Sequence, residues 1–171
     1  TTWHENGQKS SERNYKDGWK DGLSTTWHEN GQKSSEGKNI VLKSTTTESN
    51  KKPSAVTPNR FGISPPHPPR PSPVREEGLW TTWYENGQQK SETNYKDGKQ
   101  DGLSTTWHEN GQQESETNYK NGKRDGLSTT WHENGQKSNE TNYRDGRTVD
   151  RIWWYETGQK RAEEKWNGVR L

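Results

Sequence analysis

Cysteine and methionine are absent from the sequence, and apolar residues are scarce. The lack of cysteine excludes a disulfide framework and thiolate chemistry. No apolar run is long enough for a signal peptide or a membrane-spanning helix. Hydrophobic residues make up only 19% of the chain, and Leu, Ile, Val and Phe together number 15 of 171 residues, which taken alone predicts disorder. A conventional two-layer core is not expected.

An excess of charge of one sign is also lacking. The net charge is +2, and Lys and Arg are interleaved with Asp and Glu along the whole chain. This is not the charge pattern of a nucleic-acid-binding protein, and it supports binding to an anionic membrane surface only weakly. We therefore expect no nucleic-acid partner.

The chain does contain ten Trp and six Tyr, most of them at a fixed interval. The motif Trp-(His/Tyr)-Glu-Asn-Gly occurs five times, and a sixth, altered copy begins at Trp154. The Trp of the five copies are Trp3, Trp27, Trp83, Trp107 and Trp131. The step is 24 residues, except for a last step of 23 and a step of 56 between the second and third copies, where 32 residues are extra. Six tandem repeats are predicted.

Each copy has the pattern of a β-hairpin. In the third copy, 79–84 is rich in β-branched and aromatic residues, Asn86-Gly87 favours a tight turn, and 89–95 forms the return strand. The stretch 97–102 then carries two Asp-Gly turn signals before the next copy. The predicted fold is all-β: an antiparallel meander of hairpin repeats in one elongated single-layer sheet. Because one hairpin buries too little surface to fold alone, stability should depend on stacked copies.

The length of the hairpin loop decides which side chains share a face. A two-residue loop would pair Trp83 with Lys90 and put Tyr95 on the opposite face from Trp83. A three-residue loop with a bulge at Gly87 pairs Trp83 with Gln89, and it is the version we favour. On that basis one face carries Leu79, Thr81, Trp83, Ser91, Thr93 and Tyr95, and the other carries Thr82, Tyr84, Lys90, Glu92 and Asn94.

The array is interrupted after Glu36. We divide the chain into repeats 1–2 (1–36), a low-complexity insertion rich in Pro, Ser and Thr (37–77) and repeats 3–6 (78–171). All eight prolines lie between 53 and 73, which predicts a disordered, partly polyproline II excursion. The segment 66–70 has the spacing of a ligand for aromatic-lined grooves, but that pattern is common by chance, and a passive inserted linker is favoured over a recognition role. The stretch 40–42 is either a short strand that replaces the lost half-repeat or part of the excursion.

No set of residues indicates catalysis. His4, His28, His108 and His132 follow Trp in their copies, but equivalent strands lie about 9–10 Å apart, too far for one metal ion, so exposed polar histidines are favoured. The Asp-Gly pairs lack the ligand spacing of a calcium loop, and the repeated Glu of the hairpin loop should be exposed. We expect a non-enzymatic protein without metal or cofactor.

The aromatic row is the candidate site for a partner. It consists of Trp27, Trp83, Trp107, Trp131, Trp154, Tyr95, Tyr119 and Tyr143. In one interpretation these rings form the interior of the array and pack on one another. In the other, a single-layer sheet leaves part of the row accessible as a groove, and aromatic residues are common in binding hot spots.

The repeated pattern Gly-Leu, Trp-(Tyr/His)-Glu-Asn-Gly-Gln, Ser-Glu and Asn-Tyr-Lys-Asp-Gly resembles the bacterial MORN repeat variant, as found in the YwqK-type group of toxin–antitoxin system antitoxins. The resemblance covers 1–36 and about 78–168 and implies a binding protein without catalytic residues. Three hypotheses follow: a protein-interaction scaffold, an antitoxin that blocks a toxin by direct contact, and a membrane-surface module. Since the chain starts inside a repeat and has no Met, we interpret it as a fragment or processed piece, and we expect it in the cytoplasm.

Overall fold

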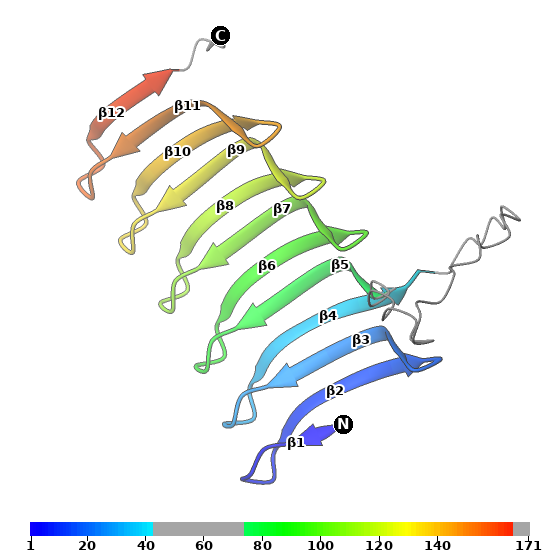
Figure 1. Cartoon of the computed structure of the whole chain (residues 1–171). Helices are drawn as coiled ribbons and strands as arrows, with labels where there is room; N and C mark the ends of the chain where they lie inside the picture. Colours follow the sequence, from blue (N-terminus) through cyan, green and yellow to red (C-terminus); the bar gives the residue numbers. More distant parts are fainter. Residues whose placement is uncertain (43–73, 166–171) are drawn as a thin grey trace, which may run out of the picture.

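The computed structural model describes residues 1–42 and 74–165, which form one sheet of twelve antiparallel strands (Figure 1). Each strand pairs with the next in the chain, so the predicted meander is confirmed. The strands are β1 (Thr2–Trp3), β2 (Lys9–Lys16), β3 (Trp19–Trp27), β4 (Lys33–Val41), β5 (Val74–Trp83), β6 (Gln89–Lys96), β7 (Lys99–Trp107), β8 (Gln113–Lys120), β9 (Lys123–Trp131), β10 (Lys137–Arg144), β11 (Arg147–Trp154) and β12 (Lys160–Lys165). No helix in the described ranges could cross a membrane.

The loop of each hairpin has three residues, as predicted. In the third copy, the N–H of Tyr84 donates to the carbonyl of Gln88 at 2.8 Å, and the N–H of Gly87 donates to the carbonyl of Tyr84 at 2.9 Å. Gly87 has a φ of 82°, a left-handed conformation that glycine adopts without steric cost. This loop brings Trp83 opposite Gln89, which confirms the predicted pairing.

A second bulge, not predicted from the sequence, follows the loop. Trp83 pairs with Gln89, but Thr82 pairs with Ser91, so Lys90 is an extra residue in β6. The same shift occurs beside the loop in the other five hairpins. From the bulge onward, the side chains of the return strand point to the opposite face from the one predicted.

The prediction that Trp83 and Tyr95 share a face is therefore wrong. Tyr95 lies opposite Gly78, on the face that carries Trp80 and Thr82, whereas Trp83 is on the other face with Leu79. We call the face that carries Trp27, Trp83, Trp107, Trp131 and Trp154 the tryptophan face. We call the face that carries Tyr95, Tyr119 and Tyr143 the tyrosine face.

Successive copies are joined by two-residue turns, except the second and third, which residues 42–73 separate. Asp97 and Gly98 have φ angles of 52° and 74°, as a type I′ turn requires. The N–H of Gly122, in the next turn, donates to the carbonyl of Gln100, which follows the turn at Asp97-Gly98, at 2.8 Å, so neighbouring turns are stacked. The second predicted turn signal is not a turn, because Gly102 lies inside β7 with a φ of 103°, at a shift in register with β6.

No apolar side chain among the described residues is fully buried. The buried side chains are small and polar: Ser11, Ser24, Thr25, Asn39, Thr105, Thr117, Ser128, Thr129 and Thr141. On the tyrosine face, hydroxyl groups of neighbouring strands are hydrogen-bonded, for example Thr93 with Ser104 at 2.8 Å and Thr117 with Ser128 at 2.7 Å. The interior of the sheet is thus made of backbone ladders and hydroxyl pairs.

Strands β4 and β5 are neighbours in the sheet although residues 42–73 separate them in the sequence. Their pairing continues as far as Val41 with Val74. We expected the insertion at 37–77, and both strands extend into this range, so that Ile40 and Val41 form the end of β4. The predictions for the proline-rich stretch and for 66–70 concern residues outside the described ranges.

Candidate binding surface on the tryptophan face

The eight residues of the predicted aromatic row lie on two faces. The five Trp are on the tryptophan face, and the three Tyr are on the tyrosine face. All eight side chains are half-buried. The sheet therefore brings the Trp together and the Tyr together, and it does not unite them in one groove.

Leucine side chains form an exposed row on the tryptophan face. Leu23, Leu79, Leu103 and Leu127 are 51, 48, 39 and 47% exposed, one in each of four copies. Between the leucine row and the tryptophan row lie Thr side chains of the same strands, several of them buried. Neighbouring copies thus present Leu at one level and Trp at another, on a sheet that has no second layer in the described residues.

Lysine and glutamate pairs accompany the tryptophan row. Lys33 Nζ lies 2.7 Å from a carboxylate oxygen of Glu36 and 5.7 Å from the ring centroid of Trp83 in the next copy. The first copy repeats this arrangement, with Lys9 3.0 Å from Glu12 and 5.1 Å from the ring of Trp27. The fifth does so as well, with Lys137 2.6 Å from Glu140 and 5.8 Å from the ring of Trp154. Each such ammonium group is held by a carboxylate and an indole ring.

The electrostatics of Glu36 reflect this contact. The hydrogen bond from Lys33 holds the pKa of Glu36 below its usual value, against a smaller opposing effect of burial. Thr25 Oγ1 donates a second hydrogen bond to the same carboxylate at 3.1 Å. The carboxylate is thus favoured in its charged form.

The third and fourth copies lack this lysine. Gln89 and Gln113 occupy its place, in the same register with the preceding Trp. Gln113 Nε2 donates to Glu116 at 3.1 Å, and Gln89 Nε2 is buried without a partner among the described residues. Within those residues, Glu92 and Glu116 form no ion pair, and no cation lies over Trp107 or Trp131.

The tyrosine face is engaged in contacts of its own. Tyr95 packs edge-to-face against Trp80, with ring centroids 6.5 Å apart. Arg124 lies over the ring of Tyr143 and donates a hydrogen bond to its hydroxyl at 3.0 Å. Burial raises the pKa of Tyr143, but its contacts with Arg124 and Arg151 together lower the pKa by more, so the net shift is downward. These intramolecular contacts leave less of the Tyr rings for a partner.

We predicted that the histidines are exposed polar residues. In the structure they are half-buried and join one copy to the next. His4 Nε2 lies 2.9 Å from the carbonyl oxygen of Trp27, and the equivalent histidines make the same contact. Because a carbonyl only accepts, Nε2 must carry the proton. Tyr84 replaces His in the third copy, and its hydroxyl donates to the carbonyl of Trp107 at 2.7 Å. No cluster of His, Asp or Glu in the described ranges could hold a metal ion.

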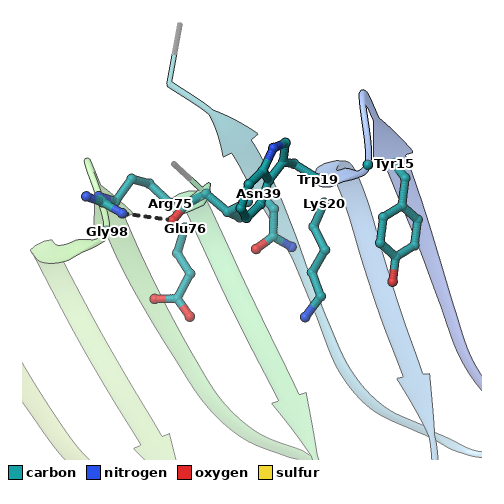
Figure 2. Close-up of a pocket in the computed structure, with 9 residues that line it drawn as sticks. Tyr15, Trp19, Lys20, Asn39, Arg75, Glu76 and Gly98 are labelled. Carbon is teal, nitrogen blue, oxygen red and sulfur yellow. Dashed lines mark hydrogen bonds between the residues drawn. The ribbon is translucent and has the colours of Figure 1, made fainter. Parts of the chain in front are cut away.

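A hollow of about 610 Å³ lies at the end of the strands that is opposite to the three-residue hairpin loops, between the turns at Gly18 and Gly98. Figure 2 shows Trp19, Lys20, Asn39 and Glu76 around it. It is located where the other copies have an Asp-Gly turn and where residues 42–73 leave the sheet. We assign no ligand to it, since that segment connects here.

Two features of the tryptophan face were not predicted from the sequence. The first is the second bulge, which puts Tyr95 on the face opposite to Leu79 and is not marked by any residue type. The Lys-x-x-Glu spacing, in contrast, was visible at Lys9, Lys33 and Lys137. On a regular strand it would put the two side chains on opposite faces, and only the bulge between them brings both to one face.

Comparison with protein-family models matches the MORN repeat variant at residues 1–17, 20–38, 76–97, 100–121 and 124–145, which is more than half of the chain. No curated protein matches the chain. Proteins built from MORN repeats are in general scaffolds that bind proteins or membranes, and they are generally not catalytic. The hairpin copies, their fixed step and the family match agree with one another, and the chain belongs to the MORN repeat variant family.

Proposed function

We propose that this chain is a non-catalytic scaffold that binds a protein partner across its tryptophan face. The observation that carries this proposal is the row of Leu23, Leu79, Leu103 and Leu127, which is between 39 and 51% exposed. Exposed apolar side chains that recur in line on one face are typical of protein-binding surfaces. The half-buried indole rings beside them add the residue type that is most common in binding hot spots.

Charge favours a protein over an anionic membrane as the partner. Each return strand places a Glu on the tryptophan face, and two of these carboxylates, Glu92 and Glu116, have no cation beside them in the described residues. A surface of anionic lipid would be repelled there. A toxin held by direct contact, as the resemblance to antitoxins suggests, would be one protein partner of this kind.

Site-specific photo-crosslinking tests the proposal in cells that produce the protein. A benzophenone amino acid at Leu103 lies on the tryptophan face, and the same group at Tyr15, which is 60% exposed on the tyrosine face, is the matched control. We expect protein adducts from position 103 and none of comparable yield from position 15. Adducts from position 15 alone, or lipid adducts alone from position 103, would overturn the proposal.

A pair of charged variants gives a second readout. Leu79→Glu with Leu127→Glu changes only exposed side chains, so the fold should persist, whereas the complex with the crosslinked protein should be lost. Tyr15→Glu should leave that complex intact. Circular dichroism of both variants verifies that the sheet is retained.

A further inference from the structure

We propose that the tryptophan face between β6 and β9, the green to yellow part of Figure 1, binds a protein segment that carries two basic side chains. One basic group is held by Trp107 and Glu92, and the other by Trp131 and Glu116. This inference rests on the proposed function, because it names the chemistry of the partner at the same surface.

The chain itself provides the template for such a site. In the first, second and fifth copies, a Lys ammonium lies 2.6 to 3.0 Å from a Glu carboxylate and 5.1 to 5.8 Å from an indole ring. Equivalent register positions hold Glu92 and Glu116 in the third and fourth copies, and Trp107 and Trp131 in the copies that follow them. The third and fourth sites therefore have the carboxylate and the indole ring, but they lack the Lys ammonium group that the first, second and fifth copies supply.

Glutamine at the lysine position does not replace that cation. Its side chain is shorter than that of lysine and uncharged, so it neither neutralises the carboxylate nor reaches over the ring as an ammonium group. Gln89 Nε2 is buried and lacks an acceptor in the described part of the chain, and Gln113 Nε2 contacts Glu116 as a neutral donor. A guanidinium or ammonium group from a partner would complete both sites.

The spacing of the two sites specifies the partner further. Equivalent strands of neighbouring copies are two strands apart, which is about 9.5 Å. A polyproline II segment repeats every three residues and rises by about 3.1 Å per residue, so residues three apart project from the same side about 9.3 Å from each other. A β-strand would point such residues to opposite sides. We infer a proline-rich segment with the spacing Arg-x-x-Arg, lying across the strands.

The test is the binding of a fluorescent peptide, Pro-Pro-Arg-Pro-Pro-Arg-Pro-Pro, to the full chain, measured by anisotropy. Two matched peptides are the controls: one has Gln in place of both Arg, and one has Arg separated by a single Pro. We expect the Arg-x-x-Arg peptide to bind at least about tenfold more tightly than either control, and more weakly as salt is added. Equal binding of the three peptides would overturn the proposal.

Protein variants locate the site. Gln89→Lys with Gln113→Lys inserts the cation found in the other copies, so the variant should fold normally and lose about tenfold or more in affinity. Gln100→Lys with Thr148→Lys adds the same charge to the tyrosine face and should change the affinity little. Lys33→Gln opens a third site beside the first two and should tighten binding of a peptide with three Arg at the same spacing. Unchanged affinity in the first variant would overturn the proposal.

The two proposals can fail separately. If the Leu79→Glu, Leu127→Glu variant loses its cellular partner while the peptide does not bind, the face is a docking surface and the basic-segment inference is wrong. If the peptide binds but crosslinking places the partner on the tyrosine face, the proposed function is wrong, whereas the inference of two cation-binding sites is supported.

Discussion

The indole ring of Trp80 lies directly over Gly37 on the tyrosine face. A Cβ added to Gly37 would be 2.0 Å from a ring carbon of Trp80, closer than any real contact. The two residues come from β5 and β4, on either side of the long insertion. At the next two junctions between copies, the same two positions hold a Thr and a Ser that are hydrogen-bonded, Thr93 with Ser104 and Thr117 with Ser128. A large and a small residue have thus replaced two of intermediate size.

This pair makes the junction between the two halves of the array sensitive to size. Gly37→Thr should lower the free energy of unfolding by about 1–3 kcal/mol, because the new side chain overlaps the Trp80 ring. Gly37→Thr with Trp80→Ser should recover most of that loss, since it recreates the hydroxyl pair of the next two junctions. Urea denaturation of the wild type, of Gly37→Thr, of Trp80→Ser and of the double variant completes the cycle. Additive effects of the two changes would show that the contact does not decide the stability of this junction.

Tyr84 gives a second prediction, on the contacts that join consecutive copies. Tyr84→Phe removes the hydrogen bond from its hydroxyl to the carbonyl of Trp107, and the free energy of unfolding should fall by about 0.5–1.5 kcal/mol. Tyr84→His should retain most of the stability, because His makes the equivalent contact in the other copies. Thermal unfolding followed by circular dichroism measures both. If Phe and His at this position were equally stable, the contact would contribute nothing.

The Lys33–Glu36 pair predicts a particular dependence of stability on pH. The hydrogen bond from Lys33 lowers the pKa of Glu36 in the folded state below the usual 4.5. Its contribution to stability is therefore present above pH 4.5 and is lost as the pH falls through the lowered pKa, when the carboxylate takes up a proton. Lys33→Gln, the residue of the third and fourth copies, should flatten this acidic limb and leave the pH dependence above 5.5 unchanged. Parallel curves for both proteins between pH 3 and 5 would contradict the assignment.

Much of the fold could be predicted from the sequence because it depends on local chemistry that is repeated. Asn86-Gly87 required a left-handed glycine, and the parity of the strands then selected a three-residue loop that pairs Trp83 with Gln89. The copies kept the same phase because their step is constant at 24 residues. Both inferences use spacings within one hairpin, where sequence and geometry are closely linked.

The arrangement of the two faces could not be predicted in the same way. The bulge at Lys90 recurs at Ser10 and Glu114, so no residue type marks it. One extra residue moves every side chain that follows to the other face. Trp83 and Tyr95, predicted on one face, therefore lie on opposite faces of the sheet. The role of the histidines was also hidden, because their acceptors are backbone carbonyls of the next copy.

The stacking of identical units leads to the last prediction, which concerns the number of copies. Deletion of 99–122 removes β7, β8 and one turn and joins Gly98 to Lys123, which restores the native Asp-Gly-Lys sequence at the junction. Because no apolar core extends across the described sheet, each copy contacts only its neighbours, and stability should follow the number of interfaces. The deletion should reduce the urea m value by roughly one sixth and lower the midpoint, and duplication of 99–122 should raise both. Loss of cooperative unfolding after the deletion would instead show that the six copies depend on a contact beyond their nearest neighbours.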